Sequence, residues 1–158
     1  MAKKRNSGVL GRAISALIII ILLVAIVGAI FEIFVAPAAS KVETTLKSKD
    51  NVSITATTGL AASLLAKGDL YLLYGYANAS ITDNVTNDII ITYKVTKDGE
   101  EKTYTAMVIY FASMGDANTV RKGIKSEVKE QGKVTMFRGK TLVVGDQKAV
   151  MKYYSVIF

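Results

Sequence analysis

The chain of 158 residues contains no cysteine, no histidine, no tryptophan and only one proline. Without cysteine it can form no disulfide, no thiolate zinc site and no iron–sulfur cluster, and it has no thiol nucleophile. Without histidine it has no imidazole metal ligand and no Ser-His-Asp triad. The composition alone therefore excludes much of the familiar chemistry of enzymes.

Acidic residues are scarce relative to basic ones, thirteen against twenty, which gives a net charge of +7. Four of the basic residues, Lys3, Lys4, Arg5 and Arg12, lie in the first twelve positions, where there is no acid. The rest of the chain carries 16 minus 13, or +3. The positive net charge therefore comes largely from the basic N-terminal segment and is weak evidence for a surface that binds polyanions.

The sequence does contain one long uncharged run, the nineteen residues from Ala13 to Phe31. As a helix this run spans roughly 28 Å at about 1.5 Å per residue, close to the thickness of a bilayer core. Apolar residues resume after Glu32 and stop before Pro37. We therefore predict a single transmembrane helix over residues 13–36.

This helix is expected to be a retained anchor, because its apolar region is longer than the roughly 7 to 15 residues of a secretory signal. Cleavage near the small residues Ala36 and Ala38 is the alternative. The four basic residues before the helix place segment 1–12 in the cytoplasm, since positive flanks stay inside. Residues 37–50 are expected to form a polar stalk, and residues 51–158 an extracytoplasmic domain.

Three Asn-x-Ser/Thr sequons fall in the segment that this topology places outside, at Asn51, Asn78 and Asn84. A glycosylation machinery could reach them only on that side of the membrane. The chain is rich in Asn, Ser and Thr, so such triplets also arise by chance. We treat the three asparagines as candidate glycosylation sites.

The sequence Arg12-Ala13-Ile14-Ser15, after a short basic leader and before the apolar run, resembles the class III signal peptide of type IV pilin-like proteins. Archaeal pilins and archaellins belong to this group. The resemblance covers about the first 35 residues, and Ala13 stands where glycine is the commonest residue. It implies cleavage after Ala13, a mature chain beginning at Ile14, and an apolar helix that anchors the protein and then packs in a filament core.

Beyond residue 50 the pattern of apolar residues predicts an α+β domain, a small antiparallel sheet with one main helix on it. Its clearest element is a hairpin in which Ile89, Ile91, Tyr93 and Val95 alternate with other residues before an Asp98-Gly99 turn. We expect helices over 59–67 and 116–131, and strands over 52–55, 70–77, 89–96, 104–111, 134–137, 141–144 and 149–158.

No phosphate-binding glycine motif, dinucleotide fingerprint or metal-ligand cluster occurs in the sequence. We therefore predict no catalytic residue, cofactor site or metal site. The predicted function is that of a single-pass, membrane-anchored surface protein whose non-catalytic domain acts by interaction or assembly. Its expected partners are the lipid bilayer and other envelope proteins or copies of itself, without nucleic acid.

Two alternatives remain open from the sequence. The first is a type IV pilin-like filament subunit, processed after Ala13. The second is a membrane-tethered hydrolase that uses carboxylates, although one sequence cannot establish the spacing that two catalytic carboxylates need.

Overall fold

The computed structural model describes residues 17–23 and 35–157, and the chain divides into two compact units, Met1–Val35 and Ala36–Phe158. In the first unit, residues 17–23 are helical and their apolar side chains are all exposed. Within the described residues, no helix is both long and apolar enough to cross a membrane. This finding contradicts the transmembrane helix of our fold prediction, of which residues 13–16 and 24–34 lie outside the described part of the chain.

The second unit is an α+β fold around a five-stranded sheet with the order β1-β2-β3-β5-β4, in which all neighbouring strands are antiparallel. Its strands are β1 (Val52–Thr58), β2 (Val85–Lys97), β3 (Glu100–Phe111), β4 (Val134–Arg138) and β5 (Thr141–Gly145). Its helices are α2 (Ala39–Lys47), α3 (Gly59–Tyr74), α4 (Ala79–Thr82), α5 (Met114–Gly123), α6 (Lys125–Glu130) and α7 (Gln147–Ile157).

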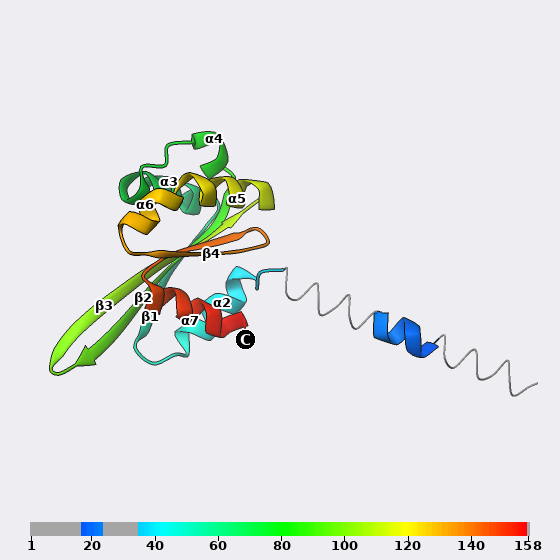
Figure 1. Cartoon of the computed structure of the whole chain (residues 1–158), viewed down its shortest axis with the longest axis horizontal. Coiled ribbons are helices and arrows are strands. Elements are labelled where there is room, and N and C mark those ends of the chain that lie inside the picture. The colour runs from blue at the N-terminus through cyan, green and yellow to red at the C-terminus, as the bar shows by residue number, and fades with distance from the viewer. Residues whose placement is uncertain (1–16, 24–34, 158) are drawn as a thin grey trace, which may run out of the picture. The chain divides into compact units, whose positions relative to one another are not determined.

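Helices cover both faces of this sheet, which corrects the expected arrangement of one main helix on one face (Figure 1). Helices α3, α5 and α6 pack on the face that carries Met107 and Ile109 of β3. Helices α2 and α7 pack on the opposite face, against Val108 and Ala106. Because side chains alternate along a strand, β3 contributes to two separate cores.

The segment expected to be a stalk contributes α2 to the second of these cores. Val42 and Leu46, four residues apart on one side of α2, are fully buried against the sheet and α7. The hydroxyl of Tyr110 donates a hydrogen bond of 3.1 Å to the carbonyl oxygen of Pro37. Residues 37–47 are therefore part of the folded unit.

The predicted β-hairpin is present. Asp98 and Gly99 both have positive φ, 56° and 81°, as a two-residue hairpin turn requires. The register pairs Lys97 with Glu100 and continues to Val85 and Phe111, with one irregularity between Val85 and Asn87.

The strand predicted over residues 70–77 is wrong, because α3 continues to Tyr74. The helix ends at Gly75, whose φ of 65° is left-handed and whose N–H donates to the Tyr71 carbonyl oxygen at 2.9 Å. Residues 70–76 are apolar at nearly every position. As a strand they would be apolar on both faces, and as a helix they would be apolar on all sides. The run therefore contained no periodicity that could distinguish the two.

The strand predicted over residues 149–158 is also wrong, since this segment belongs to α7. Ala149, Val150, Tyr153 and Val156 are buried at helical spacing. The β-branched and aromatic content of the segment favoured a strand, but packing on the sheet selects the helix.

The helix predicted over residues 116–131 is in fact two helices, α5 and α6, which meet at Ile124. Ser113 caps α5, because its hydroxyl accepts a 3.1 Å hydrogen bond from the backbone N–H of Asp116. The ring of Tyr76 lies so close to Gly123 that a Cβ there would be 2.6 Å from it. Gly123 thus provides the space in which the segment after α3 packs on α5.

Candidate functional site

The side of α3 that points away from the sheet carries no charged residue. At about 100° per residue, seven of its residues fall within an arc of about 140°. This set, called here the outer face of α3, consists of Leu60, Ala61, Leu64, Leu65, Gly68, Tyr71 and Leu72. Its large side chains are well exposed, with values of 75% for Leu60 and 78% for Leu72.

The opposite side of α3 already supplies the contacts that hold the helix on the sheet. Ala62, Ala66 and Leu70 are fully buried, and Tyr74 is nearly so. A helix that is apolar on all sides is normally buried on all sides. Within the described residues, the outer face of α3 is therefore an apolar surface that packs against nothing, and such surfaces mark interaction sites.

Gly68 lies in the middle of this face and leaves a notch in it. A Cβ at this position would meet no atom within 4 Å, so nothing in the fold requires glycine there. Glycine inside a helix costs about 0.5 to 1 kcal/mol relative to alanine. On the surface of α3 the neighbours of Gly68 are the residues three and four positions away, Leu64, Leu65, Tyr71 and Leu72. The four side chains frame a hole of the kind that receives a side chain from another helix.

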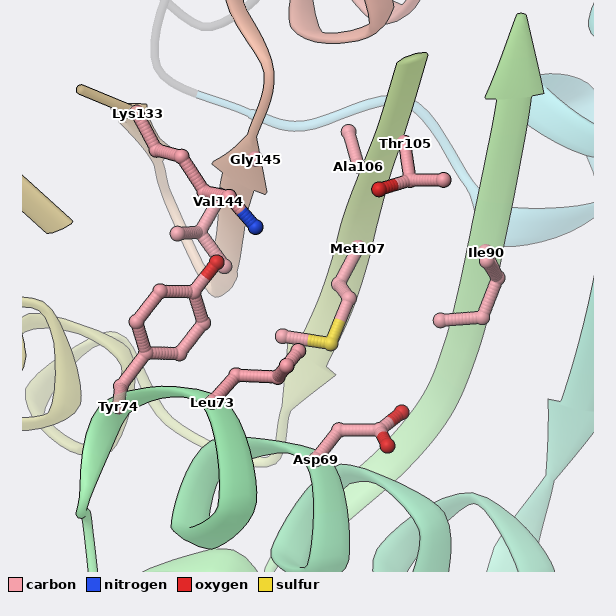
Figure 2. Close-up of a pocket in the computed structure, with 10 residues that line it drawn as sticks. All are labelled: Asp69, Leu73, Tyr74, Ile90, Thr105, Ala106, Met107, Lys133, Val144 and Gly145. Carbon is pink, nitrogen blue, oxygen red and sulfur yellow. The ribbon is translucent and has the colours of Figure 1, made fainter. Parts of the chain in front are cut away.

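A second feature is a hollow of about 220 Å³ between α3 and the sheet (Figure 2). Its apolar walls come from three elements, with Leu73 on α3, Ile90 on β2 and Met107 on β3. Lys133, which precedes β4, and Gly145, at the end of β5, also line it. The hollow is smaller than the roughly 300 to 1,000 Å³ typical of drug-sized ligands.

Charged and polar groups lie on two sides of the hollow. Figure 2 shows the ammonium of Lys133 near the hydroxyl of Tyr74, and the carboxylate of Asp69 on the other side, with Leu73 and Met107 between them. The Lys133 Nζ atom is 5.9 Å from the centroid of the Tyr74 ring. Burial raises the pKa of Asp69. Burial, and then the charges of Asp146 and Asp69, raise the pKa of Tyr74 to about 12.

A second carboxylate, Asp88, lies on β2 two residues from Ile90 and so on the same face of the sheet. It is only 1% exposed, and its Oδ1 atom has no hydrogen-bond partner. Burial, and then the negative charge of Asp69, raise the pKa of Asp88 to about 7, against a hydrogen bond from the Ile89 backbone that lowers it. Asp69 is the carboxylate that lines the hollow, while the charge of Asp146 acts on Tyr74 from nearby.

The three candidate glycosylation sites are all exposed. Asn51 has a left-handed φ of 61° in the turn before β1. The side chain of Asn78 accepts a hydrogen bond from the Ser80 hydroxyl at 2.8 Å, and the Asn84 amide donates to the Ser80 carbonyl oxygen at 3.2 Å. Accessibility is compatible with modification, and glycosylation of these residues stays a prediction.

The other sequence-predicted sites lie outside the described residues. They are the candidate cleavage site at Ala13 and Ile14 and the topogenic basic residues Lys3, Lys4, Arg5 and Arg12.

Comparisons with known proteins add no assignment: no family model matches the chain, no curated protein matches it, and no solved structure matches it. The outer face of α3 was not predicted, because residues 59–77 were interpreted as a short helix followed by a strand. A signal was present: residues 59–74 contain only two charged residues, Lys67 and Asp69, before the helix-ending Gly75.

Proposed function

We propose that this chain is a membrane-attached surface protein whose folded unit, residues 36–158, is a non-catalytic assembly module. Its partner is a second copy of the chain, which binds the outer face of α3. The observation that carries the proposal is the uncharged, exposed outer face with a glycine notch at its centre. Burial of this face between two copies removes apolar surface from water.

The outer face of α3 is small, which favours a partner that is already held close to it. A stable interface in solution buries about 800 Å² on each partner, whereas the largest apolar patches on single proteins measure about 300 to 600 Å². A single helix face belongs to the smaller class. Attachment of two copies to the same membrane raises their effective concentration, so a small interface is sufficient.

Membrane attachment is proposed from the sequence alone, from the basic segment 1–12 and the uncharged run 13–31, most of which lies outside the described residues. The expected orientation places the N-terminus in the cytoplasm and the folded unit outside. Alkaline extraction of membranes should leave the chain in the pellet, and protease added to intact cells should digest the folded unit. Release of the chain by alkali would contradict attachment.

Assembly is tested with two differently tagged copies expressed in one membrane and isolated through one tag. We expect the second copy to be recovered with the first. The double variant Leu64→Ser, Leu72→Ser should lose this recovery, because it places hydroxyls on both sides of the notch. A matched control, Met114→Ser with Met151→Ser, removes two side chains that are 59% and 54% exposed on α5 and α7, and it should retain recovery.

Equal recovery of the α3 variant and the control would contradict an interface on α3. Absence of recovery for the unaltered chain, with the chain still in the membrane, would contradict self-assembly. Recovery of a different envelope protein through α3, without a second copy, would replace the proposed partner.

A further inference from the structure

The hollow beside α3 contains two opposite charges that do not pair. Among the described residues, salt bridges join Lys47 to Glu43, Lys67 to Asp83 and Lys94 to Glu101, and none includes Asp69 or Lys133. Both side chains are partly buried and both line the hollow. Partly buried charges normally have partners, because loss of hydration costs free energy. Apart from the approach of Lys133 to the Tyr74 ring, the two charges have no oppositely charged partner among the described residues and are available to a ligand.

The groups around the hollow divide into a donor side and an acceptor side. The Lys133 ammonium and the Tyr74 hydroxyl are both hydrogen-bond donor groups, and they lie close together (Figure 2). The Asp69 carboxylate accepts hydrogen bonds and lies across the apolar side chains of Leu73 and Met107. Asp146, whose charge acts on Tyr74, does not line the hollow and already accepts a 2.7 Å hydrogen bond from the Thr105 backbone N–H. A complementary ligand has an anionic group at one end and a cationic group at the other.

The volume of the hollow restricts the ligand further. At about 30 Å³ for each water molecule, 220 Å³ holds about seven water molecules. This room accommodates a short chain with a charged group at each end. Ile90, Met107 and Leu73 give the middle part of such a ligand an apolar environment.

We infer that the hollow binds a small zwitterion whose carboxylate contacts Lys133 and Tyr74, whose ammonium contacts Asp69, and whose apolar body lies on Met107. An ω-amino acid has this chemistry. The site goes beyond the proposed assembly function, because its charged residues are not part of the outer face of α3. Failure of either proposal leaves the other intact.

The test uses the full-length chain in detergent solution, with isotope-labelled methionine methyl groups observed by NMR. The probe is ε-aminocaproate, and its halves are caproate, which lacks the ammonium, and hexylamine, which lacks the carboxylate. We expect a saturable shift of the Met107 methyl signal with ε-aminocaproate, while Met114 and Met151, which do not line the hollow, stay unchanged. Caproate and hexylamine should each bind at least tenfold more weakly.

Two variants separate the ends of the site. Lys133→Gln and Asp69→Asn should each weaken ε-aminocaproate binding at least tenfold. Lys140→Gln, which removes an exposed lysine that does not line the hollow, is the matched control and should bind like the unaltered chain. A thermal melt of each variant verifies folding, and the comparison of the three ligands on the unaltered chain needs no variant.

Each of four outcomes would overturn the inference. The first is that ε-aminocaproate causes no saturable shift of Met107. The second is that caproate or hexylamine binds as tightly as the zwitterion, and the third is that all three variants bind it with equal affinity. A shift of Met114 or Met151 equal to that of Met107 would likewise show non-specific binding and overturn it.

Discussion

Helices α2 and α3 lie on opposite faces of the same sheet and differ in what they expose. Each packs an apolar side on the strands, through Val42 and Leu46 in α2 and through Ala66 and Leu70 in α3. The far side of α2 is polar, with Ser40, Lys41, Thr44 and Lys47 exposed. The far side of α3 exposes leucines and a tyrosine.

This difference shows which apolar side chains of the two helices the fold requires and which it does not. The α2 pattern, apolar inside and polar outside, is what a surface helix needs for packing and solubility. Helix α3 packs equally well with its inner side alone, so its outer apolar side chains add nothing to the monomer. Their exposure is the reason for the interface proposed above. The predictions below test this division, from the largest expected effect to the smallest.

The largest effect should separate the two sides of α3. Leu70→Ala removes a fully buried side chain and should lower the free energy of unfolding by about 3 to 5 kcal/mol. Leu46→Ala on α2 should cost a similar amount. Leu72→Ala, on the outer face, should change stability by less than about 0.5 kcal/mol. Urea unfolding of the chain measures all three, and a large cost for Leu72→Ala would mean that the outer face is packed within the monomer.

The second prediction concerns Asp88, a carboxylate that is buried on the α3 side of the sheet. Because the folded state holds Asp88 at a pKa of about 7, against 3.8 ordinarily, it binds more protons than the unfolded state between these values. This contribution therefore favours the folded state at low pH and is lost as the pH rises toward about 7. The loss should amount to about 2 to 4 kcal/mol.

Unfolding of the parent chain and of Asp88→Asn, measured across this pH range, isolates the contribution. The difference between the two stabilities should change with pH in the stated direction. A constant difference would show that Asp88 titrates normally and would contradict its burial under the α3 layer.

The third prediction compares the starts of α3 and α5, which share a face of the sheet. Ser113→Ala removes the bond that caps α5 and should cost about 1 kcal/mol. Thr58 makes no side-chain cap bond to α3, so Thr58→Ala should cost clearly less. Thermal unfolding distinguishes the two. Equal costs for the two variants would show that Thr58 stabilises the start of α3 as much as Ser113 stabilises the start of α5.

The last stability effect, that of Gly68→Ala, should be small, and its sign is the informative part. The added methyl group meets no atom in the fold, and alanine favours helix, so the variant should be more stable by about 0.5 to 1 kcal/mol. The same methyl group fills the notch and should weaken the association of two copies. A gain in stability with unchanged association would contradict a role for the notch.

The hairpin and the two short strands β4 and β5 were predictable because their signals are local. Asp98-Gly99 specifies a turn, and alternation specifies the strands on either side. Helix α3 was not predictable in full, because its outer face replaces the polar residues on which a helical period depends. The exposed apolar side chains from which the interface is proposed are thus also what concealed the helix in the sequence.

Helix α7 and the hollow were missed for different reasons. The buried residues of α7, such as Tyr153 and Val156, prefer strands locally, and only contact with the sheet and α2 makes them helical. The hollow joins α3, three strands and Lys133, which are distant in sequence. No local pattern could have brought Asp69 and Lys133 together, since that depends on the topology of the sheet.

The assembly of two copies through α3 is tested most directly by single-cysteine cross-linking, because the chain has no cysteine of its own. Leu64→Cys, Gly68→Cys and Leu72→Cys report the outer face of α3, and Ser40→Cys and Thr44→Cys report the polar face of α2. On oxidation in membranes, we predict disulfide-linked dimers from the α3 positions and none from the α2 positions. Dimers from α2 and α3 in equal yield, or from neither helix, would contradict the account.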